Sequence, residues 1–326
     1  MLSILARIAA VLCLGAFAPT VLFAAQDAAF TKPIRIVISF PPGGPTDSTM
    51  RIIAEELGKT LQQSVYIENK AGAAGNLGAQ YVAKAAPDGY TFLASSSAYA
   101  VNPSLYGPKA GYNPDKDFVP VVVISKQPNV ISVGENVPVQ NLAELKEYAK
   151  TNKLSFSSPG TGTTPHLTCE NVFHAIWKSD IVHIPYKGAG PASVAVYSGE
   201  TPIGCTAAYG VFQFYKQGKV KILAVSADQR MPSLPNVPTF LEEGYKDIND
   251  YNWTTLFAPT GTPPALIEKM NVAINQIIAK PEFIDKFDKG GLIPVGGNVA
   301  ETGQYISSEL KHWGDIVKYL GLTADQ

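Results

Sequence analysis

The sequence predicts an α/β protein built from two lobes. Short runs rich in β-branched residues alternate with segments whose apolar residues recur at helical spacing, and this holds in both halves of the chain. Each half also contains a strand that breaks at a glycine-rich turn and continues as a helix. With 326 residues, 46% of them hydrophobic, the chain is long enough for two buried cores. We expect two crossings between the halves, which would leave a cleft between the lobes.

The N-terminal stretch has the features of a secretory signal peptide, which we assign to residues 1–25. Arg7 precedes a mainly apolar run at residues 8–23, and the small residues Ala24 and Ala25 follow it. The run is short for a membrane-spanning helix, so we expect cleavage near Ala25 and export to the periplasm. The formal net charge of −1 gives no reason to expect a nucleic-acid partner.

The first half of the chain follows a strand–helix–strand–helix–strand order. We expect strands from residue 34 and at residues 64–69 and 90–94, with helices ending near Gly58 and at residues 77–86. Such an order implies a parallel sheet with helices on its faces. Ligands bind beyond the carboxyl ends of the strands in such sheets. The turn at residues 40–46 and the serines at residues 95–97 lie at such ends.

The second half repeats this alternation after a polar connection at residues 102–117. We expect extended runs at 118–125 and 129–133, split at 126–128, and this split marks the first crossing between lobes. Lobe 1 is assigned to residues 30–127 and 253–326, and lobe 2 to residues 128–252. The elements expected beyond the crossing are helices at 141–151, 188–195, 265–279, 283–290 and 302–320, and strands at 154–157, 181–186, 201–206, 220–225 and 253–258. The C-terminal helices should pack back on lobe 1.

Two strand-to-helix turns, one in each half, are candidates for anion binding. In the first, Thr46 or Asp47 is expected to cap the helix that follows the Gly43–Gly44 turn. In the second, Thr164 is the expected N-cap and Pro165 the first helical residue. Bare N–H groups and the positive end of the helix dipole favour an anion at such a turn. Either turn alone would be explained as a chain reversal that needs glycine, so the argument depends on the pair.

Several segments, in order along the mature chain, resemble the periplasmic solute-binding proteins of tripartite tricarboxylate transporters, also called the Bug family. The matching stretches are residues 32–37, 40–47, 68–78, 86–91, 102–106, 115–120, 158–162 with 166–167, 185–188, 234–239, 258–263 and 312–313. This resemblance implies a type II periplasmic-binding-protein fold, with two α/β lobes that close on a small organic carboxylate. It also implies delivery to a small and a large membrane subunit, no cofactor, and two loops that hold one carboxylate, partly through ordered water.

The candidate ligand-binding residues come from both turns and from neighbouring strand ends. They are Phe40, Pro42, Gly43, Gly44, Thr46, Asp47, Ser95, Ser96, Ser97, Ser158, Gly160, Thr161, Gly162, Thr163, His166, Lys187, Ala207 and Tyr209. Asp47 is equally well explained as a capping residue, since its charge would repel a carboxylate. Amino-acid binders of the family are expected to carry an aspartate near positions 206–209. This chain has none there, which predicts a ligand without an amino group.

The remaining expectations concern classes of chemistry. Cys169 and Cys205 are expected as two buried thiols, with a disulfide as the alternative that export permits. No histidine pair at metal-ligand spacing is recognised, so we expect no metal site, and His174, His183 and His312 are assigned structural or surface roles. An exported hydrolase using His166, Ser158 and Asp47 and a ligand-presenting sensor are the alternatives to a transport receptor. A monomer that is not an enzyme is expected.

Overall fold

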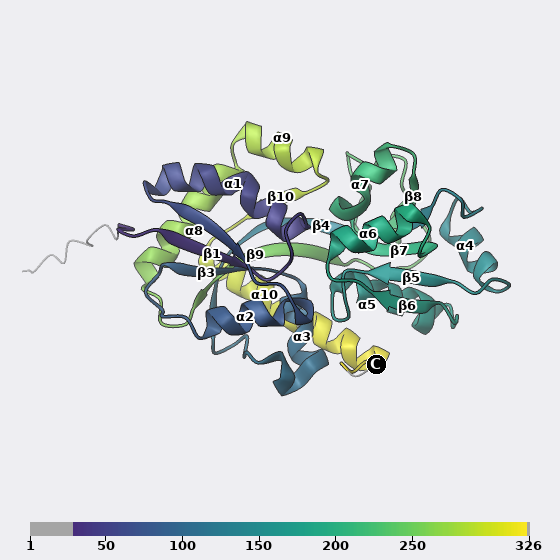
Figure 1. Ribbon diagram of the computed structural model, residues 1–326, viewed down its shortest axis with the longest axis horizontal. Coiled ribbons are helices and arrows are strands. Elements are labelled where there is room, and N and C mark those ends of the chain that lie inside the picture. The colour runs from purple at the N-terminus through teal and green to yellow at the C-terminus, as the bar shows by residue number, and fades with distance from the viewer. Residues whose placement is uncertain (1–28, 325–326) are drawn as a thin grey trace, which may run out of the picture.

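The computed structural model describes residues 29–324. The predicted signal peptide at residues 1–25 lies outside this range. Within residues 29–324, none of the helices combines the length and apolar character that a membrane span requires. The elements form two α/β lobes side by side, and the long strands β4 (Phe118–Gly134) and β9 (Tyr251–Pro259) run between them (Figure 1).

Lobe 1 begins with the parallel sheet that the sequence predicts. Strand β1 (Ile34–Ile38) lies between β2 (Val65–Asn69) and β3 (Thr91–Ser96) and pairs with both in parallel. Helix α1 (Pro45–Leu61) covers one face, and α2 (Asn76–Ala83) lies on the other (Figure 1). Alternating residues of β1 and the apolar side of α1 are buried in one core because the strand period of two and the helix period of 3.6 each place them inward. The predicted βαβαβ unit is thus confirmed.

The connection after β3 differs from the prediction. Residues 98–106 form helix α3 (Ala98–Tyr106), followed by a 3₁₀ turn, Gly107–Ala110. The polar, Pro- and Gly-containing stretch at residues 102–117 hid the end of this helix, which contains Pro103. Tyr99, Val101 and Leu105 are buried in a core shared with the C-terminal helix, so tertiary packing overrides the weak local preference for helix.

Strand β4 (Phe118–Gly134) is continuous, where the sequence predicted two runs split at residues 126–128. Pro128 is tolerated because it lies at the end of the ladder with β9 (Tyr251–Pro259), opposite its first residue, and pairing with β7 begins only at Asn129. The register shifts twice between Pro120 and Ser125, which bends the strand. The sheet order is β2-β1-β3-β9-β4-β7-β5-β6, in which β5 (Ser155–Ser158), β6 (Val182–Pro185) and β7 (Ile203–Ala207) belong to the second half of the chain. Strands β4 and β9 therefore carry the sheet from one lobe into the other. Because β4 crosses the proposed boundary, the limits at 127/128 and 252/253 stay predictions.

Lobe 2 contains parallel strands flanked by helices, as expected. Strand β5 pairs in parallel with β6 and β7, while β7 and β8 each pair antiparallel with β4. The strands are β5 (Ser155–Ser158), β6 (Val182–Pro185), β7 (Ile203–Ala207) and β8 (Val220–Val225), and the helices are α4 (Leu142–Ala149), α5 (Thr164–Glu170), α6 (Ala189–Ser198) and α7 (Ala208–Lys216). Helix α5 continues directly into a π-helical segment, Asn171–Ile176.

The two cysteines of lobe 2 form a disulfide. The sequence favoured two free thiols, but Cys169 of α5 and Cys205 of β7 are bonded, with their Cα atoms 6.3 Å apart. Helix α5 packs directly on β7, which places the two side chains together in one buried cluster. Spacing along the chain carries no information about such a cross-element contact, so the preference for free thiols was wrong.

The C-terminal segment returns to lobe 1, as predicted. Helix α8 (Pro264–Ile278) and α9 (Pro281–Lys289) lie on the same side of the sheet as α1, and α10 (Val299–Leu320) lies with α2 and α3 on the other (Figure 1). The short strand β10 (Ile293–Gly296), which the sequence did not reveal, pairs with β4. This return closes lobe 1 around both faces of its sheet.

Candidate functional site

Two strand-to-helix turns open helices on opposite sides of the interlobe cleft. The β1–α1 turn ends at Gly44, which is the N-cap of α1, so neither Thr46 nor Asp47 is the cap. The β5–α5 turn ends at Thr163, which is the N-cap of α5, one residue earlier than predicted. Neither N-cap residue makes a side-chain capping bond, and Pro45 and Pro165 occupy the first helical turns.

The two turns line one cavity, about 40 Å³ in volume. Helix α6, whose N-cap is Gly188, and α7, whose N-cap is Ala207, also begin at its wall, so four helix N-termini converge there. Since one ordered water needs about 10–15 Å³, the space between the lobes is that of a few waters. The lining residues are Phe40, Pro41, Pro42, Gly44, Pro45, Thr46, Ser96, Pro159, Thr163, Pro165, Gly188, Ala189, Gly190, Pro191, Ala207 and Asn252.

The cavity is lined by helix N-termini and hydroxyl groups and not by charged side chains. Among residues 29–324, none of those that line it carries a charge. The first N–H groups of a helix have no partner inside the helix, and no side chain caps α1, α5 or α6. In α7, by contrast, the N–H of Tyr209 is bonded by Gln127 Oε1 at 2.8 Å. Free backbone donors, hydroxyls and converging dipoles suit an anion that fits between the lobes.

Asp47 shapes the first turn and does not face the cavity. Its Oδ2 accepts from the N–H of Gly43 and from Arg51 Nε, both at 2.9 Å, and its Oδ1 accepts from Asn69 Nδ2 at 2.9 Å. Burial raises the pKa of Asp47, but the hydrogen bonds from Arg51, Gly43 and Asn69 outweigh it, and the pKa lies below its usual value. Asp47 does not line the cavity, and its ion pair with Arg51 reduces its repulsion of an anionic ligand. Its hydrogen bond to the Gly43 N–H holds that residue at φ +82°.

A second, wider cavity of about 510 Å³ adjoins the first and shares Phe40, Pro41, Pro159 and Gly188 with it. The predicted residues Gly160, Thr161 and Lys187 line this outer space, together with Tyr106, Tyr186 and the turn at residues 71–75. Lys187 is the one lysine or arginine among the predicted residues, and it lines this outer cavity. The part of a ligand that extends beyond the inner cavity would lie here.

Contacts between the lobes run along the same cleft. Tyr106 of α3 donates its hydroxyl to the carbonyl of Thr161, at 3.0 Å. Ser97 Oγ lies 2.7 Å from Thr164 Oγ1, and Asn252 Nδ2 donates to Ser97 at 3.0 Å. The hydroxyl of Ser97 is therefore part of a bridge between lobes, behind the cavity wall that Ser96 forms. Each of these contacts joins the two lobes, so it would break if the lobes separated.

Other predicted residues lie outside both cavities. Ser95 Oγ is buried against Ser39 Oγ at 3.0 Å, and Tyr209 packs against the core of lobe 1. The N–H of Gly162 donates to His166 Nδ1 at 3.4 Å, and Ser158 Oγ lies 2.7 Å from His183 Nε2. The structure therefore brings Ser158 to His183 and leaves Asp47 with other partners, so the imagined triad of His166, Ser158 and Asp47 is not assembled.

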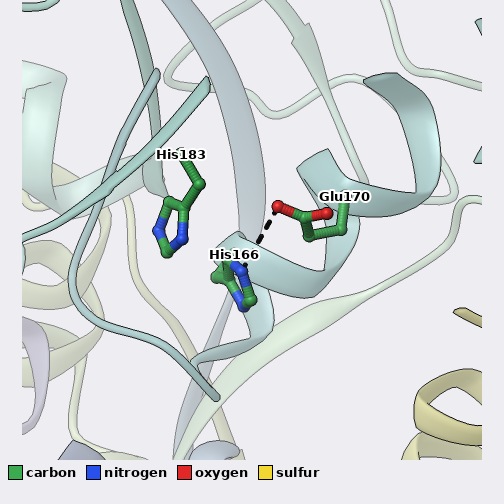
Figure 2. A group of neighbouring side chains, drawn as sticks. All are labelled: His166, Glu170 and His183. Atoms are coloured by element: carbon green, nitrogen blue, oxygen red, sulfur yellow. Dashed lines mark ion pairs between the residues drawn. The ribbon is translucent and has the colours of Figure 1, made fainter. Parts of the chain in front are cut away.

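Behind the second turn lies a buried cluster of His166, Glu170 and His183 (Figure 2). His166 Nε2 lies 3.4 Å from Glu170 Oε1, and His174 Nδ1 lies 2.5 Å from Glu170 Oε2. Burial raises the pKa of Glu170, but the hydrogen bonds from both histidines outweigh it and lower the pKa to about 2. Burial is the main cause that lowers the pKa of His183 to about 3.

Some of these residues could have been found from the sequence. His166, Glu170 and His174 are spaced four residues apart and so share one face of a helix. Gly188 and Gly190 open α6 with the same strand–glycine–helix pattern as the two recognised turns. Tyr106 and Asn252 left no local signal, because their roles depend on contacts made across the cleft.

Comparison with known proteins gives consistent results. Residues 49–322 match the tripartite tricarboxylate transporter family receptor. The chain is 31% identical to the periplasmic binding protein BugD, with a TM-score of 0.85 over 90% of this chain and 99% of that one. A protein of R. palustris solved with adipate is 30% identical, with a TM-score of 0.86 over 90% of this chain and 98% of that one. MatC of Rhodopseudomonas palustris, with bound malate, is 31% identical, with a TM-score of 0.82 over 88% and 99%.

Proposed function

Because this chain belongs to the tripartite tricarboxylate transporter receptor family, the group that includes the Bug proteins, we propose that it captures a small organic carboxylate in the periplasm. The bound form is delivered to a small and a large membrane subunit of a secondary transporter. The chain acts as a monomer and performs no chemistry on its ligand. The observation that carries the proposal is the cavity at which the N-termini of α1, α5, α6 and α7 meet.

A carboxylate fits this cavity for a physical reason. Each helix N-terminus contributes about 0.3–2 kcal/mol toward an adjacent anion, depending on burial. Hydrogen bonds from N–H and hydroxyl groups to a charged oxygen add roughly 1.5–3 kcal/mol each before desolvation is counted. A carboxylate that touches Thr46 and Ser96 on one side and Thr163 on the other stabilises the closed form, because only that form offers both sets of contacts. Related proteins solved with adipate and malate support this ligand class.

The ligand is proposed to carry no amino group. An ammonium in a desolvated cavity needs an anionic partner, and residues 206–209 contain no acid. Ala207 supplies only backbone and a methyl group to the wall of the inner cavity. Dicarboxylates and aromatic acids, whose far end would extend toward Lys187 in the outer cavity, are the classes to test.

A thermal-shift panel followed by calorimetric titration tests the proposal. The panel holds malate, adipate, a tricarboxylate, benzoate, aspartate and glutamate, each with its matched neutral amide or alcohol. A carboxylate at a hundred times its dissociation constant should add about 2.7 kcal/mol to the free energy of unfolding. Tight binding of aspartate or glutamate with no response to the other acids would refute the ligand class. Stabilisation by the neutral analogues alone would refute the anion site.

Delivery is tested separately, by uptake of the labelled ligand into cells. Deleting the gene for this chain should abolish uptake as fully as deleting the gene for the large membrane subunit of the transporter. Uptake that continues without this chain while transcription of other genes loses its response to the ligand would favour the ligand-presenting sensor instead. Turnover of the ligand by the purified chain, seen by chromatography, would favour an enzyme.

A further inference from the structure

A second site lies inside lobe 2, behind the β5–α5 turn and outside both cavities of the cleft. Its members are the three side chains of Figure 2: His166 and Glu170 on α5, and His183 on β6. The exposed surfaces of His166 and Glu170 are 3% and 8%, so neither is a solvated surface group. One ligand atom from each of the three lies within 4.8 Å of the other two. Two imidazoles and one carboxylate are a donor set that suits Zn²⁺.

The spacing within α5 already has the dimensions of a zinc site. Bonds of about 2.1 Å place tetrahedral ligand atoms about 3.4 Å apart. His166 Nε2 and Glu170 Oε1 are separated by 3.4 Å, because residues four apart lie one above the other on a helix. The ligand atoms of the three residues now lie within 4.8 Å of one another. To reach tetrahedral spacing, the ring nitrogen of His183 has to move about 1 Å closer to the other two atoms. The His183 ring is half-buried on the edge strand β6, which gives an ion access from solvent.

The remaining polar atoms of the cluster are held by protein groups that orient the donors. Glu170 Oε2 is bound by Nδ1 of His174. The other ring nitrogen of His174, Nε2, lies 2.8 Å from the carbonyl oxygen of Ile181. Ser158 Oγ bonds His183 Nε2 at 2.7 Å, which leaves Nδ1 of that ring for an ion. The His183 ring stacks on Phe156, at 4.8 Å between centroids, and lies against the His166 ring at 4.1 Å, tilted by 31°. Outer partners of this kind fix ring orientation in metal sites.

We propose that His166 Nε2, Glu170 Oε1 and His183 Nδ1 bind one Zn²⁺ ion, with water as the fourth ligand. When His166 binds through Nε2, its proton resides on Nδ1. The contact from the Gly162 N–H to Nδ1, at 3.4 Å, is then lost. Zinc in this site therefore removes a contact that holds the Gly160–Gly162 turn, part of which lines the outer cavity. In this way it affects the ligand site without touching the ligand.

The experiment uses the tag-free mature chain, stripped with a chelator and titrated with Zn²⁺ by calorimetry. We expect one ion per chain, with His183→Gln weakening binding more than 100-fold and His174→Gln weakening it 10–100-fold. His312 lies on α10, outside the cluster, so His312→Gln is the matched control. Its dissociation constant for Zn²⁺ should be within twofold of that of the parent chain. Co²⁺ should give the intense visible bands of a four-coordinate site in the parent and the control.

A measurement on the parent chain keeps the test independent of how the variants fold. The mature chain has four histidines, at positions 166, 174, 183 and 312. In ring-nitrogen NMR spectra, Zn²⁺ should shift His166 Nε2 and His183 Nδ1 most and leave His312 unmoved. Absence of saturable binding at tens of micromolar Zn²⁺, equal binding by His183→Gln, or shifts confined to His312 would each overturn the proposal.

Discussion

Replacing Gly162 with alanine should weaken ligand binding far more than it destabilises the fold. Gly162 lies on the lobe 2 side of the cleft at φ +90°, and a Cβ there would lie 2.7 Å from Asn102 Oδ1 and 2.9 Å from Leu105 Cδ2. Both contacted residues belong to α3 of lobe 1. Asn102 cannot withdraw freely, because it is buried and its Nδ2 donates to Ala74 and Asn76, at 2.9 and 2.7 Å.

Two separate costs follow from this geometry. Left-handed backbone costs a non-glycine residue about 1–2 kcal/mol, whether the lobes are open or closed. Overpacking against α3 costs about 1–3 kcal/mol more, and only in the closed form. The free energy of unfolding should therefore fall by the first cost alone, since the variant can open. The second cost should appear in the binding free energy. Because 1.4 kcal/mol corresponds to a tenfold change, the affinity should fall roughly 5- to 150-fold.

Gly199→Ala is the matched control. Gly199 follows α6 at φ +79°, and an added Cβ there meets nothing within 4 Å. It carries the backbone cost without the contact between lobes. Urea unfolding and calorimetric titration, with the carboxylate that stabilises the chain most in the thermal-shift panel, measure both quantities. If both variants bind that ligand equally well, closure of the Gly162 turn onto α3 is not part of the bound state and the reasoning fails.

Three further changes test the contacts described above. Tyr106→Phe removes a hydrogen bond between the lobes and should weaken binding by about 2- to 13-fold, since such a bond contributes about 0.5–1.5 kcal/mol. Replacing Cys169 and Cys205 by serine should lower the free energy of unfolding by about 4 kcal/mol, because they close a loop with a sequence separation of 36. The hydrogen bond to Asp250 raises the pKa of His312. His312→Gln should therefore lower the free energy of unfolding by its full amount below about pH 6.5. The difference from the parent chain should disappear as the pH rises through the folded-state pKa.

Each of these has its own control and its own contrary result. Tyr99→Phe loses a hydroxyl bond to Pro114, at 3.3 Å, inside lobe 1 and should leave affinity unchanged. Reducing the disulfide of the parent chain should lower the free energy of unfolding as much as the serine substitutions do. If either change lowers it by less than about 1 kcal/mol, the disulfide does not constrain the unfolded chain as assumed. For His312, Asp250, Glu309 and Asp315 act on the ring, and a stability difference that grows with pH would contradict the assigned direction.

Secondary structure was predictable where local pattern and tertiary environment agree. The runs that became β1, β2 and β3 are apolar and β-branched, and the helices between them carry one apolar face, so the parallel sheet followed from the chain alone. The prediction missed α3 and split β4, and it assigned both cysteines as thiols. In each case the deciding interaction joins residues far apart in sequence, such as α3 with α10.

The positions of the cleft residues could be predicted only in part. The two turns were recognisable because a strand, a glycine pair and a helix start have a local signature, and both now line connected cavities. Ser95 and Tyr209 were predicted because they follow strand ends, and Gly162 and His166 because they belong to the second turn. All four lie outside the cavities, against the protein interior or the other lobe. A side chain alternates between the two sides of a strand, so neighbours in sequence do not share a cavity.

By itself, the sequence determined that two α/β lobes form and that each presents glycine-rich helix N-termini, since strand period, helix period and positive-φ turns are local properties of the chain. Only the tertiary structure decided that four of those termini meet at one uncharged cavity. It also decided that Asp47 turns away from that cavity, and that His166 and Glu170 meet His183 from another strand. Convergence of this kind depends on how the elements pack, because burial and dipole direction are set by neighbours that lie far apart along the chain.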